Sequence, residues 1–242
     1  ITALPIKAQK LLLIFNPMVG YSILYRDVMY YGRMPNFKML AYSNINVKVE
    51  TADPSSLALF GLAIVTLVAS TQKIGITVGL SLVIPWAIFL GGAAQMIGCL
   101  GDFKRNNVFG ATAFGAYALF WWSVATSWMI KMGVFGEEFV NAVDTKQLGY
   151  VFMGYLIFSL FMTIGSMKNN KVLFVIFVFI DLLFVGLSLS ILATGSLAEF
   201  GHHLGAYSEL MISLFSFYLC ASTVLNPHFG RIILPTGKAL SR

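Results

Sequence analysis

The sequence predicts an all-α, polytopic membrane protein with six transmembrane helices. Hydrophobic residues make up 58% of the 242 residues and charged residues only 11%, with a mean hydropathy of +0.81. Ordinary soluble domains do not have this composition. Six apolar runs follow one another after residue 52, and most are near the roughly 20 residues that a helix needs to cross a bilayer.

Residues 1–51 are predicted to form a separate leader in the cytoplasm or along the membrane surface. The first 50 residues hold six of the sixteen basic residues and several tyrosines, but no apolar run of span length. Tyrosine and lysine are both common at membrane interfaces. Residues 52–242 are then expected to form one transmembrane domain.

The six spans are predicted from the apolar runs and from the turn residues between them. The first begins at Asp53-Pro54, because Asp as N-cap followed by Pro at the first helical position is a strong helix start. The second contains Pro85, which is expected to kink it. The predicted spans are 57–70, 77–100, 111–132, 148–167, 172–194 and 204–225.

The distribution of positive charge predicts that both termini are cytoplasmic and that the protein lies in the cell membrane. Thirteen of the basic residues fall on the N-terminal side of this topology, and only Lys73, Lys131 and Lys146 fall on the other side. Cytoplasmic loops of membrane proteins carry the excess of Lys and Arg. The formal net charge of +6 is therefore explained by orientation in the membrane, and no nucleic-acid partner is expected.

Two helix faces in the stretch 89–128 suggest a polar route through the membrane. Before a charged turn at 102–107, small residues and one amide recur at helical spacing; after it comes an aromatic stripe with one hydroxyl. Glycines on a transmembrane helix usually let neighbouring helices approach closely. A buried amide and a buried phenol need another explanation, because lipid offers them no partner. The first face consists of Gly91, Gly92, Gln95 and Gly98, and the second of Gly110, Phe114, Tyr117, Trp121 and Trp128.

Polar residues on the last two spans have two open interpretations. Five polar residues share one face of the sixth span and either line a cavity or bond neighbouring helices. Asp181 lies near the middle of the fifth span, where an ionised carboxylate costs about 2.5–3.5 kcal/mol. It is therefore protonated, paired or hydrated, and is either functional or bonded to a neighbouring helix. The face on the sixth span consists of Glu209, Ser213, Ser216, Cys220 and Thr223.

The residues do not support an enzyme, a cofactor or a metal site. His202 and His203 are adjacent and predicted to lie in a loop, and His228 lies in the tail. A metal site requires clustered His, Cys or carboxylate ligands. The alternatives are a transporter or channel, and a membrane receptor or sensor. The loops are too short for the soluble domain that a receptor usually carries.

Three separated motifs follow one another along the spans and the tail. They are Gly91-Gly92-x-x-Gln95, then Asn107-x-Phe109-Gly110-x-Thr112-Ala113-Phe114-x-x-Tyr117-x-x-Phe120-Trp121, and Leu225-Asn226-x-x-Phe229-Gly230-Arg231-x-x-Leu234-Pro235-x-Gly237. In this order they resemble the acetate uptake transporter family, which includes the bacterial succinate–acetate permeases and the fungal acetate- and ammonia-related proteins, and the resemblance covers residues 52–238. The family's entrance motif, Asn-Pro-Ala-Pro-Leu-Gly-Leu, is present in altered form, with Asp53, Pro54 and Leu57 at matching positions.

The resemblance implies a six-helix protomer with its own pore, assembled as a homo-hexamer that moves acetate and other small carboxylates such as succinate. It places the narrowest part of the pore at Leu62, Tyr117 and Ile180. It also places Ser216 where a small residue influences substrate choice. Gln95, Glu209 and Asp181 are the other polar candidates for the pathway, and the two carboxyls are expected to make transport pH-sensitive.

Physical chemistry favours movement of the acid together with a proton. A bare carboxylate in a low-dielectric interior faces an idealised cost of the order of 20 kcal/mol. Protonating a carboxyl group of pKa ~4.3 at pH 7 costs only about 4 kcal/mol. Proton-linked uptake is therefore predicted, with a passive anion channel as the first alternative and a receptor without transport as the second.

Overall fold

The computed structural model describes residues 11–16, 20–25 and 51–241. The chain divides into two units, Ile1–Val49 and Glu50–Arg242. In the first unit, β1 (Leu11–Asn16) and β2 (Gly20–Tyr25) pair as an antiparallel two-stranded sheet. The rest of the predicted leader, apart from its last residue, lies outside the described residues.

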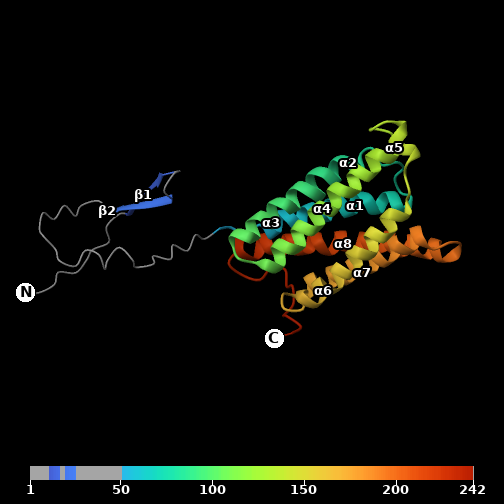
Figure 1. The fold of residues 1–242 in the computed structure, drawn as a ribbon. Coiled ribbons are helices and arrows are strands. Elements are labelled where there is room, and N and C mark those ends of the chain that lie inside the picture. The colour runs from blue at the N-terminus through green and yellow to red at the C-terminus, as the bar shows by residue number, and fades with distance from the viewer. Residues whose placement is uncertain (1–10, 17–19, 26–50, 242) are drawn as a thin grey trace, which may run out of the picture. The chain divides into compact units, whose positions relative to one another are not determined.

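The second unit is helical, and the prediction of six spans is confirmed. Within the described residues, six helical segments are long and apolar enough to cross a membrane. They lie side by side as a bundle, and the short helix α5 (Glu137–Asn141) lies at one end (Figure 1). The six segments are α1 (Ser55–Ile74), the composite segment Val83–Lys104, α4 (Val108–Lys131), α6 (Lys146–Ser166), α7 (Lys171–Leu192) and α8 (Ser196–His228).

The second span differs from its prediction in where it begins and in the role of Pro85. It consists of α2 (Val83–Trp86), the wider π-helix η1 (Ala87–Ala94) and α3 (Gln95–Lys104). Pro85 lies in the first turn of α2, where an N–H has no intrahelical partner, so a proline is tolerated there. The predicted mid-helix kink at Pro85 is therefore wrong, and the predicted start at residue 77 is six residues too early.

Two other helix ends differ from their predictions. Pro54 is the N-cap of α1, and Asp53 accepts a hydrogen bond from the Ser55 N–H at 3.0 Å. The helix therefore begins one residue later than the Asp-Pro signal predicts. The last span is longer than predicted, so His202 and His203 lie exposed on α8 and not in a loop.

The glycines of the second span allow close packing within the protomer. A Cβ at Gly91 would lie 2.6 Å from Trp121, and one at Gly98 would lie 2.6 Å from Ala58. The expectation that these glycines let helices approach is confirmed. Their neighbours are α4 and α1 of the same chain, so these glycines are occupied by contacts within the protomer.

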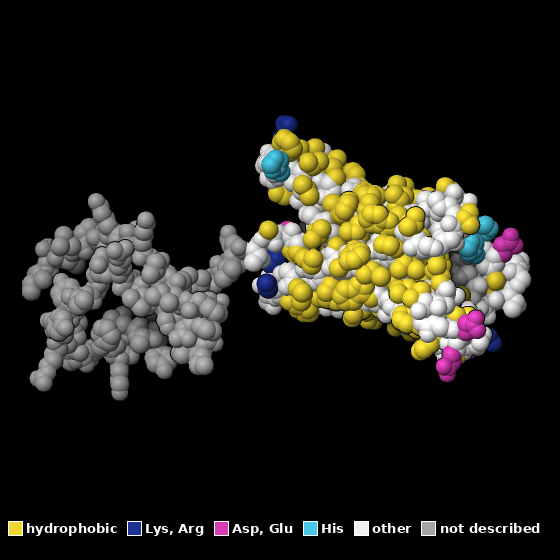
Figure 2. All heavy atoms as spheres, turned by 90° about the horizontal axis from the view of Figure 1, so that it is seen from above, with side chains coloured by type: hydrophobic (Ala, Val, Ile, Leu, Met, Phe, Trp, Pro, Cys, Tyr) yellow, Lys and Arg dark blue, Asp and Glu magenta, His cyan; other side chains and the backbone are white. Residues whose placement is uncertain are grey.

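Aromatic rings fill the centre of the bundle, and hydrophobic side chains cover its outside. Phe184 of α7 lies with its ring centroid 5.3 Å from that of Phe120 and 6.4 Å from that of Tyr117. Figure 2 shows hydrophobic side chains across the middle of one face and charged side chains at its two ends. This distribution is the one expected for a bundle surrounded by lipid.

The third sequence motif fixes the C-terminal tail against the bundle. The Asn226 side chain accepts hydrogen bonds from the N–H groups of Ile233 and Leu234 at 2.8 and 3.0 Å, and donates one to the Leu234 carbonyl. Beyond this turn, Leu240 donates to the Met167 carbonyl at the end of α6. The tail therefore lies at the same end of the bundle as the α6–α7 turn.

Candidate functional site

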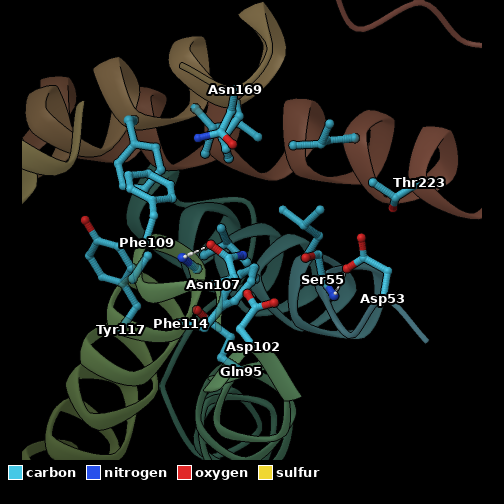
Figure 3. Close-up of a pocket in the computed structure, with 18 of the residues that line it drawn as sticks. Asp53, Ser55, Gln95, Asp102, Asn107, Phe109, Phe114, Tyr117, Asn169 and Thr223 are labelled. Atoms are coloured by element: carbon cyan, nitrogen blue, oxygen red, sulfur yellow. Dashed lines mark hydrogen bonds between the residues drawn. The ribbon is translucent and has the colours of Figure 1, made fainter. Parts of the chain in front are cut away.

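A cavity of about 240 Å³ opens between α1, α3, α4, α7 and α8 at the end of the bundle where α1 begins. We call it the Asp102 cavity. Figure 3 shows Gln95, Asp102 and Asn107 on one side of it and Asn169 and Thr223 on the other. Its lining residues are Asp53, Ser55, Leu59, Leu62, Gln95, Asp102, Arg105, Asn107, Phe109, Gly110, Ala113, Phe114, Tyr117, Asn169, Asn170, Leu173, Ile176, Phe177, Ile180, Leu219 and Thr223.

Two buried polar side chains of this cavity have unused hydrogen-bonding groups. Gln95 and Asp102 are both fully buried, and neither amide atom of Gln95 nor either carboxylate oxygen of Asp102 makes a hydrogen bond to the described protein. Leaving such a group unsatisfied costs about 1–3 kcal/mol. A partner that is not part of this chain, whether water or a ligand, is therefore expected in the cavity.

Charged residues line the mouth of the Asp102 cavity. Arg105 Nη1 lies 2.7 Å from Asp53 Oδ1 and 3.8 Å from Asp102 Oδ1. Burial acts to raise the pKa of Asp53, but the hydrogen bonds from Ser55 and Arg105 and the Arg105 charge outweigh it, so its pKa lies below the ordinary value. Asp53 is therefore a carboxylate at neutral pH, and it holds Arg105 across the mouth.

The three residues predicted for the constriction meet at the inner end of this cavity. Leu62 of α1, Tyr117 of α4 and Ile180 of α7 line both the Asp102 cavity and a second space of about 20 Å³. That second space, which we call the Tyr117 constriction, holds about one water molecule. Its other lining residues are Thr66, Phe120, Trp121, Leu183, Phe184 and Ile212.

The hydroxyl of Tyr117 is bonded to a neighbouring helix. Tyr117 Oη donates to Ser159 Oγ of α6 at 3.2 Å, in a fully buried environment. The aromatic ring of Tyr117 therefore borders the constriction, while its hydroxyl already has a partner.

A third space continues from the constriction towards the other end of the bundle. This Lys73 cavity has a volume of about 160 Å³ and shares Phe120, Trp121 and Leu183 with the constriction. Three spaces therefore follow one another along the bundle, two large and one narrow between them. The other residues of the Lys73 cavity are Lys73, Val124, Trp128, Lys131, Leu148, Phe152, Leu187, Ile191 and Glu209.

The aromatic stripe predicted on the third span lies along this passage. Gly110 and Phe114 line the Asp102 cavity, Tyr117 and Trp121 line the constriction, and Trp128 lines the Lys73 cavity. The residues of this face therefore border all three spaces, and that the spaces form a route through the membrane stays a prediction.

The polar face of the sixth span contacts α1 along its middle, and the interpretation that it lines a cavity holds only for its two end residues, Glu209 and Thr223. Ser213 Oγ donates to the Ala63 carbonyl at 2.7 Å, and Cys220 Sγ to the Ser56 carbonyl at 3.2 Å. Ser216 is fully buried, its hydroxyl makes no hydrogen bond within the described residues, and it lines neither cavity. Thr223 alone of this face lines the Asp102 cavity, because α1 packs along the rest.

The two predicted acidic residues lie in different surroundings. Asp181 faces α6, where its Oδ2 accepts a hydrogen bond from Thr163 Oγ1 at 2.7 Å, and it lines none of the three spaces. Its position corrects the prediction that it borders the pathway. Glu209 lies in the Lys73 cavity, where its Oε2 is 2.7 Å from Lys73 Nζ.

Three residues of the entrance-motif stretch 53–59 line the cavity, namely Asp53, Ser55 and Leu59. Pro54 instead packs next to Gly101 of α3, and Leu57 is 44% exposed on the outer surface of α1. The predicted role of Pro54 and Leu57 at the entrance is therefore limited to the start and packing of α1.

Sequence reasoning missed Asp102, which it assigned to a charged turn. The helix instead continues to Lys104, and Asp102 is fully buried. A usable signal was the spacing from Gln95, because residues seven apart lie on one face of a helix. The Lys73–Glu209 pair was also missed, since 136 residues separate its members.

Comparison of the sequence with known proteins identifies the family to which this chain belongs. The model of the GPR1/FUN34/yaaH family matches residues 38–238. This chain belongs to the GPR1/FUN34/yaaH family. The resemblance that the three motifs indicate is therefore confirmed.

Several similar proteins are named for transport. The chain is 33% identical to the succinate-acetate/proton symporter SatP of Escherichia coli (strain K12) over 194 residues, 78% of this chain and 97% of that protein. It is 28% identical to acetate permease A of Emericella nidulans over 60% of this chain and 50% of that protein. The solved structure of the bacterial acetate channel SatP matches with a TM-score of 0.70 and 31% identity, over 78% of this chain and all of that one.

Proposed function

We propose that this protein carries acetate, and other small carboxylates such as succinate, across the cell membrane. The acid passes through the protomer itself, from the Asp102 cavity through the Tyr117 constriction to the Lys73 cavity. The observation that carries this proposal is the continuity of the three spaces, in which Leu62, Tyr117 and Ile180 are shared by the first two. In this structure the constriction has room for about one water molecule, so passage requires these side chains to move.

Uptake is linked to a proton. The constriction is lined mainly by aliphatic and aromatic side chains, and a bare carboxylate loses most of its hydration there. Crossing as the neutral acid avoids that cost, because protonation at pH 7 needs only about 4 kcal/mol. Gln95 and Asp102, with unused polar atoms in the cavity, are placed to exchange hydrogen bonds with the acid before it enters the constriction.

Both termini of the chain are cytoplasmic, and the Asp102 cavity opens to the cytoplasm. The end of the bundle at which α1 begins also carries Lys104, Arg105, Lys168 and Lys171. The opposite end has Lys73, Lys131 and Lys146 among the acidic residues Glu137, Glu138, Asp144 and Glu199. This asymmetry supports the orientation by the positive-inside rule.

Residues 1–51 form a cytoplasmic or interfacial leader, residues 52–242 form the transporter domain, and the protein assembles as a homo-hexamer. The proposal of a homo-hexamer rests on the family resemblance of the sequence. Native mass spectrometry from mild detergent checks this part, with a hexamer as the expected mass and a monomer as the contrary result.

Passive conduction of the anion is the second candidate, since one relative is named as an acetate channel. The two mechanisms differ in their response to voltage. A symport of acetate with one proton moves no net charge, whereas a channel for the anion responds to a membrane potential.

Uptake of radiolabelled acetate into proteoliposomes tests the proposal. Uptake is measured with an inside-alkaline pH gradient and, separately, with a potassium diffusion potential, and protein-free liposomes give the background of acetic acid crossing the lipid. Proton-linked transport predicts protein-dependent uptake that follows the pH gradient and ignores the potential. Uptake that follows the potential indicates a channel, and no uptake above background favours a receptor.

A further inference from the structure

The Lys73 cavity contains an ion pair between one helix end and the middle of another helix. Lys73 lies in the last turn of α1, and Glu209 lies on α8. Lys73 Nζ is 2.7 Å from Glu209 Oε2, and their side chains are 17% and 2% exposed. Lys131, in the last turn of α4, lines the same cavity.

Contacts other than this ion pair also hold α1 against α8. His202 Nε2 of α8 is 2.9 Å from the Lys73 carbonyl oxygen, and Ser213 and Cys220 also bond to carbonyls of α1. A buried ion pair contributes little net stability, because both charges lose their hydration. Two charged side chains at the wall of a passage therefore require a reason other than stability.

The contact itself shows what Lys73 can bind. The group at 2.7 Å from its ammonium is a carboxylate, which is also the functional group of the proposed cargo. We propose that Lys73 is a carboxylate-binding residue of the Lys73 cavity and that Glu209 is a tethered competitor, which the carboxylate of the cargo displaces. This inference rests on the proposed function for the identity of the cargo.

The charges of the cavity favour a cargo with a single negative charge. The cavity is lined by two basic side chains, Lys73 and Lys131, and one acidic side chain, Glu209, so one bound monocarboxylate balances their formal charges. A dicarboxylate leaves an excess negative charge in a space of about 160 Å³. Acetate is therefore expected to bind here better than succinate, because like charges in a confined site repel each other.

The test depends on two substitutions that have opposite effects. Binding of radiolabelled acetate to the purified full-length protein is measured by equilibrium dialysis. Glu209→Gln removes the competing carboxylate, so the dissociation constant for acetate is expected to fall severalfold. Lys73→Gln removes the binding group, so the dissociation constant is expected to rise about tenfold or more.

Control variants separate this effect from general surface charge and from misfolding. Lys146→Gln removes an exposed lysine near the same end of the bundle and is expected to leave acetate binding unchanged. Lys73→Arg keeps the charge and is expected to retain binding. If Lys73→Gln alone does not fold, the double variant Lys73→Gln/Glu209→Gln is used, because it leaves no isolated charge. It is expected to bind acetate as weakly as is expected of Lys73→Gln.

The inference is overturned if Glu209→Gln weakens binding as Lys73→Gln does, if neither changes it, or if the double variant binds like the unmodified protein. These results are distinguishable from failure of the proposed function. Opposite effects on binding without any acetate flux in proteoliposomes support the inference and reject transport. Normal acetate flux in proteoliposomes supports transport. If Lys73→Gln and Glu209→Gln then shift the dissociation constant for acetate in the same direction, transport stands and the inference is rejected.

Discussion

Ile180 and Asp181 are consecutive residues of α7 that contact different parts of the protein. Ile180 lines the Tyr117 constriction, and Asp181 accepts a hydrogen bond from Thr163 of α6 at 2.7 Å. The difference follows from helix geometry, because consecutive residues point about 100° apart. The face of α7 that borders the passage is therefore apolar, and its carboxylate is bonded between two helices.

Shortening Ile180 is expected to widen the passage. Ile180→Ala removes the side chain beyond Cβ at a position shared by the Asp102 cavity and the constriction. Three- and four-carbon acids should then gain more uptake than acetate. A hydrophobic site discriminates one methylene by about 1–3 kcal/mol. The preference for the longer acid over acetate should therefore rise between about tenfold and two-hundredfold, and not more. Uptake of labelled lactate and acetate into proteoliposomes measures it.

Asp181→Ala is the matched control on the neighbouring residue. It is expected to leave the ratio of lactate to acetate uptake unchanged, because Asp181 faces α6. A rise in lactate uptake for Asp181→Ala and not for Ile180→Ala would assign the wrong face of α7 to the passage.

The hydrogen bond between Thr163 and Asp181 is expected to contribute to stability and not to pH dependence. Thr163→Val removes the donor and should lower the free energy of unfolding by about 0.6–1.7 kcal/mol, the measured range for such bonds between membrane helices. Asp181→Asn keeps an acceptor and should leave the pH profile of acetate uptake unchanged. A displaced pH profile for Asp181→Asn would show that Asp181 takes part in proton movement.

Gln95 is expected to matter for transport while contributing nothing to stability. Neither of its amide atoms bonds to the described part of the protein, so an apolar side chain of similar shape removes no protein hydrogen bond and spares the cost of burying the amide. Gln95→Met should therefore leave the melting temperature unchanged or raise it, while acetate uptake falls. Gln147→Met, at an exposed glutamine, is the control. A lower melting temperature with normal uptake would contradict this assignment.

The pair of Asp53 and Arg105 is expected to weaken anion binding at the mouth of the Asp102 cavity. Asp53→Asn frees Arg105 from its 2.7 Å contact and should lower the half-saturating acetate concentration from that side. The change should not exceed about fivefold, because an exposed ion pair is worth about 0.2–1 kcal/mol. Acetate efflux measured at several internal concentrations tests it, and weaker apparent affinity in Asp53→Asn would contradict it.

The lowered pKa of Asp53 gives this variant a defined pH dependence. A carboxyl whose pKa is lower in the folded state contributes stability above its unfolded pKa of about 3.9 and loses it as the pH falls through the folded value. The difference in melting temperature between the unmodified protein and Asp53→Asn should therefore be constant from pH 6 to 8. This difference in melting temperature should disappear as the pH falls through the folded pKa of Asp53.

Much of the fold was predictable from the sequence because a bilayer restricts what a chain can do. Apolar runs of span length give the helices, since in lipid a helix satisfies its backbone hydrogen bonds within one segment. The start at Val83 was missed because residues 77–82 are also part of an apolar run, although they form no helix.

The residues of the site were predictable only where spacing on one helix carried the information. The aromatic stripe on α4 follows from helical periodicity, and Leu62 and Ile180 follow from the family resemblance. The partners of Asp181 and Glu209 are Thr163 and Lys73, and no periodicity connects residues on different helices. The same polar pattern on the sixth span fits a cavity wall or a helix contact, and only the position of α1 decides between them.

Modification of a single cysteine in the constriction tests most directly whether the acid passes through the protomer. Cys99 and Cys220 are first replaced by alanine, and Leu62→Cys or Leu57→Cys is then introduced on the same helix. Leu62 borders the constriction, whereas Leu57 is 44% exposed on the outer surface. A bulky neutral methanethiosulfonate is added, mass spectrometry confirms modification, and acetate uptake into proteoliposomes is measured. The account predicts that modified Leu62→Cys loses uptake and modified Leu57→Cys retains it. Unchanged uptake in fully modified Leu62→Cys would contradict a passage through this constriction.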